Sequence, residues 1–222
     1  MASLPNPRDL LTSLLTTLAS PPNPPSSPSA PNPLRDAQPE KAALLSTLHV
    51  LVPSLLLPSL DLLDRGLVTR VLRKPTAEPH ATQRGQEDEE GGEAERTEGR
   101  EGETGEKGLY VVKSLASTMK RKESGYYIVL LAPWTCTCPA FTLDAFPPNP
   151  PIPNEDTAEN TRRPSGADPE WSFGGLAADA NPPCCKHLLA CVLTERWADV
   201  LGRYVPVRRV GRGEMAGLVA DV

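Results

Sequence analysis

Two short stretches, Cys136-Thr-Cys138 and Cys185-Lys-His187, decide how this chain is expected to fold. Zinc prefers four tetrahedral ligands, and thiolate sulfur together with imidazole nitrogen is a common structural set. Residues two apart on an extended chain point the same way, so Cys136 and Cys138 can face one ion. Cys185 and His187 open a helical segment, whose first N–H groups stabilise negative charge on sulfur. The four residues therefore predict one structural Zn²⁺ site.

The two halves of this site are 46 residues apart, and three alternatives follow from the cysteines around them. The long gap is tolerable because loop closure costs only about 0.6 kcal/mol more per doubling of length. Cys184 is the alternative to Cys185 as a ligand. Cys191, four residues after His187, is expected to be a core residue. A thiol nucleophile beside His187 is the rival chemistry, but two cysteines already stand together at Cys136-Thr-Cys138 and no orienting Asn or Asp stands out.

Composition indicates that a large part of the chain does not build a core. Hydrophobic residues make up 39% of its 222 residues, and it has 26 prolines and 16 glycines. The formal charge of -5 is concentrated in residues 83–107, which hold ten acidic and four basic side chains. The rest carries 18 acidic and 19 basic residues, so the overall charge does not exclude a nucleic-acid partner.

The sequence gives no indication of secretion or of a membrane span. A basic segment followed by an apolar core and a cleavage site is missing at the N-terminus. The most apolar stretch, 44–63, is interrupted by His49, Pro53, Pro58 and Asp61. We therefore expect a soluble intracellular protein with no membrane partner, in which five cysteines serve as metal ligands or free thiols rather than in disulfides.

Hydrophobic periodicity locates the regular elements. Asn6 and Pro7 are typical of a helix start, and the glycine at position 66 is typical of a helix end. Apolar residues recur at helical spacing in four segments, and β-branched residues favour strands in three. The predicted helices cover 7–19, 39–52, 54–63 and 184–197, and the predicted strands cover 67–72, 109–115 and 126–131, the last two forming a hairpin.

These elements predict an α+β fold. It comprises Leu-rich N-terminal helices, a small antiparallel β-sheet of about three strands, and a zinc finger that joins the hairpin to a C-terminal helix. Long insertions without large apolar residues are expected to be disordered, because they cannot offset their ordering entropy. The expected divisions are 1–20, N-terminal helix; 21–38, Pro-rich linker; 39–72, helical segment and first strand; 73–108, acidic insertion; 109–143, hairpin and first half of the finger; 144–183, second insertion; 184–204, second half of the finger and helix; 205–222, tail.

The two ligand stretches resemble a known family once their neighbours are included. Cys136-Thr-Cys-Pro-Ala-Phe141 and Cys185-Lys-His-Leu-Leu-Ala190 are similar to the SWIM zinc finger, which has the pattern C-x-C, a variable gap, C-x-H and an alanine three residues on. The chain further resembles the small SWIM subunit of the Shu complex, on 60–65 (LDLLDR), 110–112 (YVV) and the two finger stretches. That resemblance covers 42–72, 109–146 and 183–202.

The resemblance implies a role and partners. The Shu complex acts in homologous recombination, so the resemblance implies a non-enzymatic nuclear subunit that supports DNA repair. It implies a heterodimer with a RecA-like recombinase paralogue, which assists the recombinase filament on single-stranded DNA. On the family pattern, Ala190 packs tightly behind the zinc or against the partner. The alternative is a SWIM finger serving a ubiquitin ligase or a transposase-related DNA-binding role.

Direct contact with DNA is a separate hypothesis, since phosphate contacts need only a basic face. Basic residues occur in the hairpin connection, in the second ligand stretch and at the end of the last helix. The residues that could form such a face are Lys120, Arg121, Lys122, Lys186, Arg196, Arg203, Arg208, Arg209 and Arg212, of which the first five are the candidate DNA contacts. Aromatic residues for base stacking are scarce, with Tyr126, Tyr127 and Trp134 the candidates near the hairpin.

Overall fold

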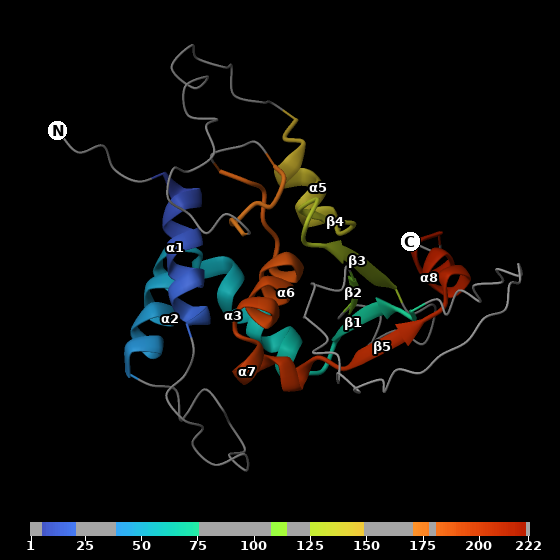
Figure 1. Ribbon diagram of the computed structural model, residues 1–222. Helices are drawn as coiled ribbons and strands as arrows, with labels where there is room; N and C mark the ends of the chain where they lie inside the picture. Colours follow the sequence, from blue (N-terminus) through green and yellow to red (C-terminus); the bar gives the residue numbers. More distant parts are fainter. Residues whose placement is uncertain are drawn as a thin grey trace, which may run out of the picture.

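The computed structural model describes residues 6–20, 39–75, 108–114, 125–148, 171–177 and 181–220. It confirms the α+β class, with helices on both sides of one β-sheet (Figure 1). The expected linker 21–38, most of the acidic insertion 73–108, the candidates Lys120, Arg121 and Lys122, and most of 144–183 lie outside these described residues. Within them, no helix is long and apolar enough to span a bilayer.

Three Leu-rich helices form the N-terminal part of the fold. In α1 (Pro7–Ala19) the Asn6 side chain accepts a hydrogen bond from the Asp9 N–H at 2.8 Å, as the capping prediction requires. α2 (Pro39–Leu51) follows and is joined to the C-terminal end of α1 by Lys41, whose Nζ donates to the Leu18 and Ser20 carbonyls. The orphan carbonyls at the end of α1 therefore have a buried partner.

The third helix, α3 (Pro53–Asp64), runs through Pro58, where the sequence predicts a kink or break. Pro58 lies in the middle of the helix, and the hydrogen bond that it cannot make is the one to the carbonyl of Ser54, a residue exposed to water. α3 ends at Asp64, and Gly66, two residues later, has φ +61°, as its predicted role as a helix stop requires.

The sheet has five strands among the described residues, in the order β4-β3-β2-β1-β5. β2 (Leu109–Lys113) and β3 (Tyr126–Leu130) form the predicted antiparallel hairpin, and β1 (Val68–Arg73) pairs antiparallel with β2. The other two strands, β4 and β5, were not among the three expected from the sequence. β4 (Thr135–Cys136) has only two residues, and β5 (Val207–Val210) contains two arginines, so neither shows a hydrophobic pattern.

β5 also changes the expected character of the sheet, because it lies parallel to β1 with Val71 opposite Arg208. It follows a short helix, α7 (Ala198–Leu201), and a 3-10 turn, η2 (Gly202–Tyr204). After it comes α8 (Arg212–Ala220). The segment 205–222, expected as a tail, thus supplies a sheet edge and a helix.

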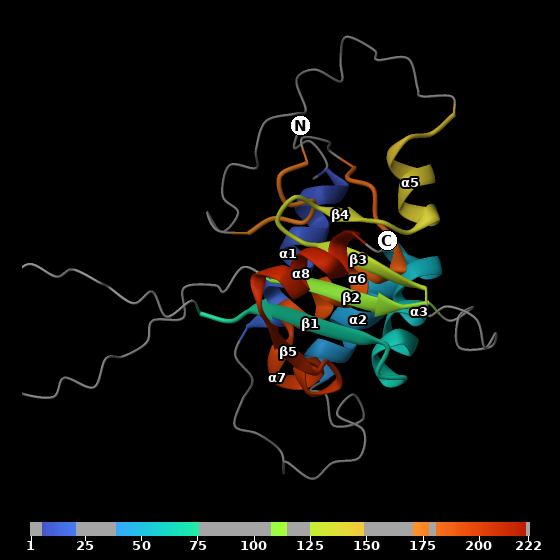
Figure 2. The same cartoon turned by 90° about the vertical axis from the view of Figure 1, so that its right-hand side faces the viewer.

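The two faces of the sheet have different covers (Figure 2). α8 lies over one face, where Met215 and Leu218 pack against a small apolar cluster. That cluster consists of Val71, Leu109, Ile128 and Val210. The other face belongs to the main core, together with α1, α2, α3 and α6.

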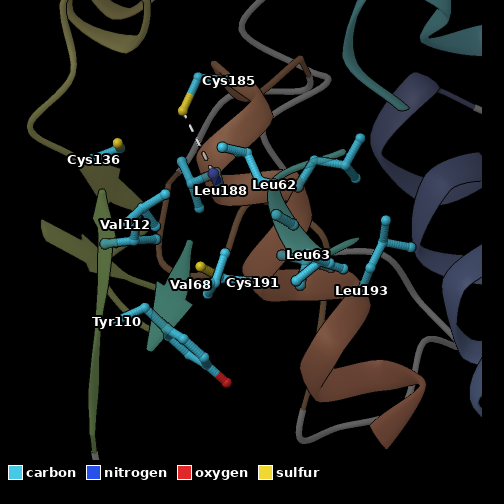
Figure 3. Packing of buried hydrophobic residues seen from close by; sticks show 14 of the residues in the cluster. Leu62, Leu63, Val68, Tyr110, Val112, Cys136, Cys185, Leu188, Cys191 and Leu193 are labelled. Carbon is cyan, nitrogen blue, oxygen red and sulfur yellow. Dashed lines mark hydrogen bonds between the residues drawn. The ribbon is translucent and has the colours of Figure 1, made fainter. Parts of the chain in front are cut away.

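α6 (Lys186–Arg196) is the centre of the main core. Residues 187–194 are all buried, as expected of a helix surrounded by other elements. Glu195, near its end, accepts a 2.7 Å hydrogen bond from Tyr110 on β2 and pairs with Arg70 on β1. Figure 3 shows Cys136 and Cys185 at one end of this core and Cys191 deeper, beside Val68.

Candidate metal centre

Cys136 and Cys138 are held in place by the residue between them. The Thr137 backbone N–H donates to the Ile128 carbonyl at 3.1 Å, and its hydroxyl accepts from the Ile128 N–H at 3.0 Å. The threonine side chain thus takes the place of a backbone acceptor beside β3. Alternation along the extended chain leaves Thr137 exposed and turns both cysteines into the protein.

A helix begins in each half of the site, and a cysteine ligand caps the N-terminus of each helix. Cys138 is the N-cap of α5 (Pro139–Ala145), and its sulfur accepts a hydrogen bond from the Phe141 N–H at 3.4 Å. Cys185 is the N-cap of α6, and its sulfur accepts from the Leu188 N–H at 3.5 Å. Both sulfurs therefore lie at positive helix ends, which favour the thiolate form that zinc requires.

The four predicted ligands converge on one point. One donor atom from each of Cys136, Cys138, Cys185 and His187 lies within 4.8 Å of the others, and all four residues are buried. His187 directs Nδ1 inward, at 3.9 Å from the sulfurs of Cys136 and Cys185. Its ring packs against Tyr127, with the centroids 4.7 Å apart.

These distances fit zinc. Zn–S and Zn–N bonds of about 2.3 and 2.05 Å in a tetrahedron place sulfur and nitrogen about 3.6 Å apart, slightly closer than the 3.9 Å seen here. A contraction of a few tenths of an ångström would close the site around the ion. Three thiolates and one imidazole are also the donors that zinc prefers.

The thiols already share protons unequally within the cluster. Hydrogen bonds from Cys136 and Cys185 lower the pKa of Cys138. The hydrogen bonds with Cys138 and Cys185, together with burial, raise the pKa of Cys136. Zinc binding must release the remaining protons, so its affinity is expected to fall with decreasing pH.

Comparison with known families agrees with this geometry. Residues 127–147 match the family model of the SWIM zinc finger. The match spans β3, β4 and α5 and includes Cys136 and Cys138, while Cys185 and His187 follow 38 or more residues later. A SWIM zinc finger therefore lies in this part of the chain, and the buried Cys/His cluster that completes it fits Zn²⁺ binding. Searches of curated proteins and of solved structures found no match.

The two remaining cysteines lie outside the cluster that the described residues form. Cys184 is half-buried, and its backbone N–H donates to Asp144 in α5 at 2.9 Å. Burial raises the pKa of its thiol, which therefore stays protonated at neutral pH. Cys191 is fully buried on α6, in the core position expected for it, and burial raises its pKa as well.

A segment inside the second insertion, Trp171 to Ala177, is docked next to the finger, where the sequence predicts disorder. Phe173 is 2% exposed and packs edge-on against Trp134, with centroids 4.7 Å apart. Its backbone N–H donates to Thr12 in α1 at 3.0 Å. Trp171 and Phe173 were the one sign of this in the sequence, because they are the only aromatics of the insertion after Phe146.

The docked segment joins α1 to the finger. Arg8 in α1 donates to the Ala177 and Gly175 carbonyls and to the Ser172 hydroxyl, over distances of 2.5 to 3.1 Å. Gly175 has φ +52°, and a Cβ there would lie 2.6 Å from the Ala132 carbonyl oxygen. Glycine is thus required for the close approach of this segment to the turn after β3.

The turn between β3 and β4 depends on Trp134. This residue has φ +56°, unusual for a side chain of its size, and its Nε1 donates to the Pro183 carbonyl at 2.8 Å. Pro183 lies two residues before Cys185, so this bond links the two halves of the finger directly. Trp134 is buried, which removes it from the candidates for base stacking.

Of the five candidate DNA contacts, two lie among the described residues, Lys186 and Arg196. Lys186 and Arg196 lie at opposite ends of α6, about 15 Å apart at 1.5 Å per residue. The Arg196 guanidinium covers the Trp171 ring at 4.5 Å from its centroid.

Ala190 is fully buried in α6, where it packs closely against the rest of the core.

Proposed function

We propose that this chain is a non-enzymatic zinc-binding subunit of a Shu-like complex, which supports recombinase filaments in homologous recombination. The observation that carries the proposal is the closed ligand set. Four buried protein ligands leave zinc no open position for a substrate or a water nucleophile. The ion would therefore stabilise the fold, with its binding energy added to the folding energy.

A protein partner is the second part of the proposal. The resemblance to the Shu SWIM subunit points to a RecA-like recombinase paralogue as the other half of a heterodimer. Support comes from large apolar side chains left exposed on the described surface, which are typical of interaction sites. Two are Leu143 in α5 and Phe146 directly after that helix, between the two halves of the finger, and two more are Val50 in α2 and Leu57 in α3.

The site of action follows from the role. A subunit that assists recombinase filaments on chromosomal single-stranded DNA would act in the nucleus. A fluorescent fusion that stayed in the cytoplasm after DNA damage would count against this part of the proposal.

The proposal is tested by co-expression with a RecA-like recombinase paralogue from the same source, followed by size-exclusion chromatography and metal analysis. We expect a 1:1 complex with one zinc per chain. His187→Ala should lose both zinc and the complex, while Cys184→Ala, a matched change beside the site, should keep both. A wild-type chain that holds its zinc and binds no such paralogue would refute the recombination role and leave the zinc site intact.

A further inference from the structure

The folded part of this chain is basic although the whole chain is acidic. The described residues hold thirteen Lys and Arg and eight Asp and Glu, a formal charge of +5. The complete chain has 23 and 28, a formal charge of -5. The remaining residues therefore carry a formal charge of -10, so the acidic pI of 5.3 does not reflect the positive charge of the described residues.

The positive charge gathers where β1, β5 and α8 meet. Arg73 closes β1 and Lys74 follows it, while β5 contributes two arginines and α8 begins with a third. We call this set the β1–β5 basic surface: Arg73, Lys74, Arg208, Arg209 and Arg212, all exposed. Among the residues that the structure describes, the Glu214 carboxylate lies beside them and pairs with Arg208.

Strand pairing places these residues along one edge of the sheet, where Arg208 and Arg209, as neighbours on a strand, point to opposite sides of that edge. Arg73 lies opposite Val210, and the Lys74 N–H donates to the Val210 carbonyl at 2.8 Å. Arg208 lies two residues, or about 7 Å at 3.3 Å per residue, before the end of β5 at Val210, and Arg212 begins α8 two residues after it. Phosphates follow each other every 3.4 Å along one strand of a duplex, so the surface can reach several at once.

We propose that the β1–β5 basic surface binds the phosphodiester backbone of nucleic acid without base preference. The proposal deepens the proposed function, on which it rests for its choice of nucleic acid as the polyanion. Three residues of the surface, Arg208, Arg209 and Arg212, belong to the wider basic set noted in the sequence, and the structure adds Arg73 and Lys74 to them. Most of the surface belongs to 205–222, outside the part of the chain that carries the family resemblance.

The lack of base preference follows from where the aromatics lie. Trp134 is buried, and Tyr127 packs on His187. Tyr126 donates its hydroxyl to the Leu218 carbonyl at 3.0 Å, under α8. None of the three hairpin aromatics stands beside the basic residues as an open stacking platform. Binding should therefore come from phosphate contacts and depend strongly on salt.

The test uses the full zinc-loaded chain and fluorescence anisotropy with a labelled single strand and a labelled duplex of the same length. About four contacts predict a slope near -0.7 per contact for a single strand, and so about 50-fold weaker binding at 200 mM than at 50 mM salt. Lys74→Gln with Arg212→Gln should reduce that loss to about 7-fold and weaken binding at low salt. The duplex arm shows whether the surface prefers one or two strands.

Two further variants separate this surface from general charge. Glu214→Gln removes the carboxylate that pairs with Arg208 and should tighten binding. Arg65→Gln also removes one exposed positive charge, but before the opposite end of β1, and should leave binding unchanged. The proposal is overturned if Arg65→Gln weakens binding as much as Arg212→Gln alone, or if the double variant binds like the wild type. Tighter binding of poly-glutamate than of either nucleic acid would also overturn it, and would assign the surface to an acidic protein.

Discussion

Replacing Phe173 by alanine tests whether the docked segment holds α1 against the finger. The Phe173 ring is 2% exposed, stacks edge-on with Trp134, and belongs to a residue whose N–H is bonded to Thr12. Truncation would leave a cavity between α1 and the turn after β3. The neighbouring Leu176 is 83% exposed and offers a matched control in the same segment.

The expected loss of unfolding free energy in Phe173→Ala follows from the burial of the ring. Buried phenylalanine to alanine changes cost about 3 to 5 kcal/mol, and the edge-on contact with Trp134 is part of that sum. The segment can detach without unfolding the sheet, so we expect the lower end, about 3 kcal/mol. Arg8 holds the same segment, and the Arg8→Ala and Phe173→Ala losses should therefore be less than additive.

Urea unfolding of the zinc-loaded chain measures the loss, and hydrogen exchange localises it. The α1 amides should exchange faster in Phe173→Ala, whereas Leu176→Ala should change the unfolding free energy by less than about 0.5 kcal/mol. If Phe173→Ala cost under 1 kcal/mol, or left exchange in α1 unaltered, the segment would not be what holds α1.

Three further outcomes follow from the structure. Acidification should release zinc as protons compete for the thiolates, and Cys184→Ser should release it at the same pH as the wild type, as measured with a zinc-responsive dye. The pKa of Tyr110 is raised by burial and by the charge of Glu195, so the unfolded chain ionises first. Unfolding free energy should hold below about pH 9 and fall above pH 10, less steeply in Tyr110→Phe, as urea titrations at both pH values would show. Gly175→Ala should cost at least about 1 kcal/mol in the same assay, because φ is positive and the Ala132 carbonyl lies close.

Local chemistry explains what could be predicted from the sequence. Asn6 before Pro7 predicts a helix start, and the glycine at position 66 predicts a helix end. In the structure α1 begins at Pro7 and α3 ends two residues before that glycine. Cys136 and Cys138 alternate with an exposed threonine, so their common direction follows from strand geometry alone. These local rules were sufficient to predict the set of metal ligands from the sequence.

The elements that the sequence did not reveal depend on distant partners. β5 contains Arg208 and Arg209 and becomes a strand because β1 offers it an edge. α5 has seven residues and is started by Cys138, whose role as a cap depends on its place at the metal site. The docked segment is stabilised by Arg8, more than 160 residues away, and no sequence window contains both.

The position of α6 and β5 late in the chain has a consequence for synthesis. Residues 187–194 fill the centre of the core, and β5 closes the sheet beside β1, the first strand to be made. A growing chain must therefore leave the ribosome with its leucine-rich helices and first strands uncovered until residues 187–210 emerge. During that interval the nascent polypeptide resembles an aggregation-prone intermediate. A stop codon before residue 187 should thus yield an insoluble, rapidly degraded product.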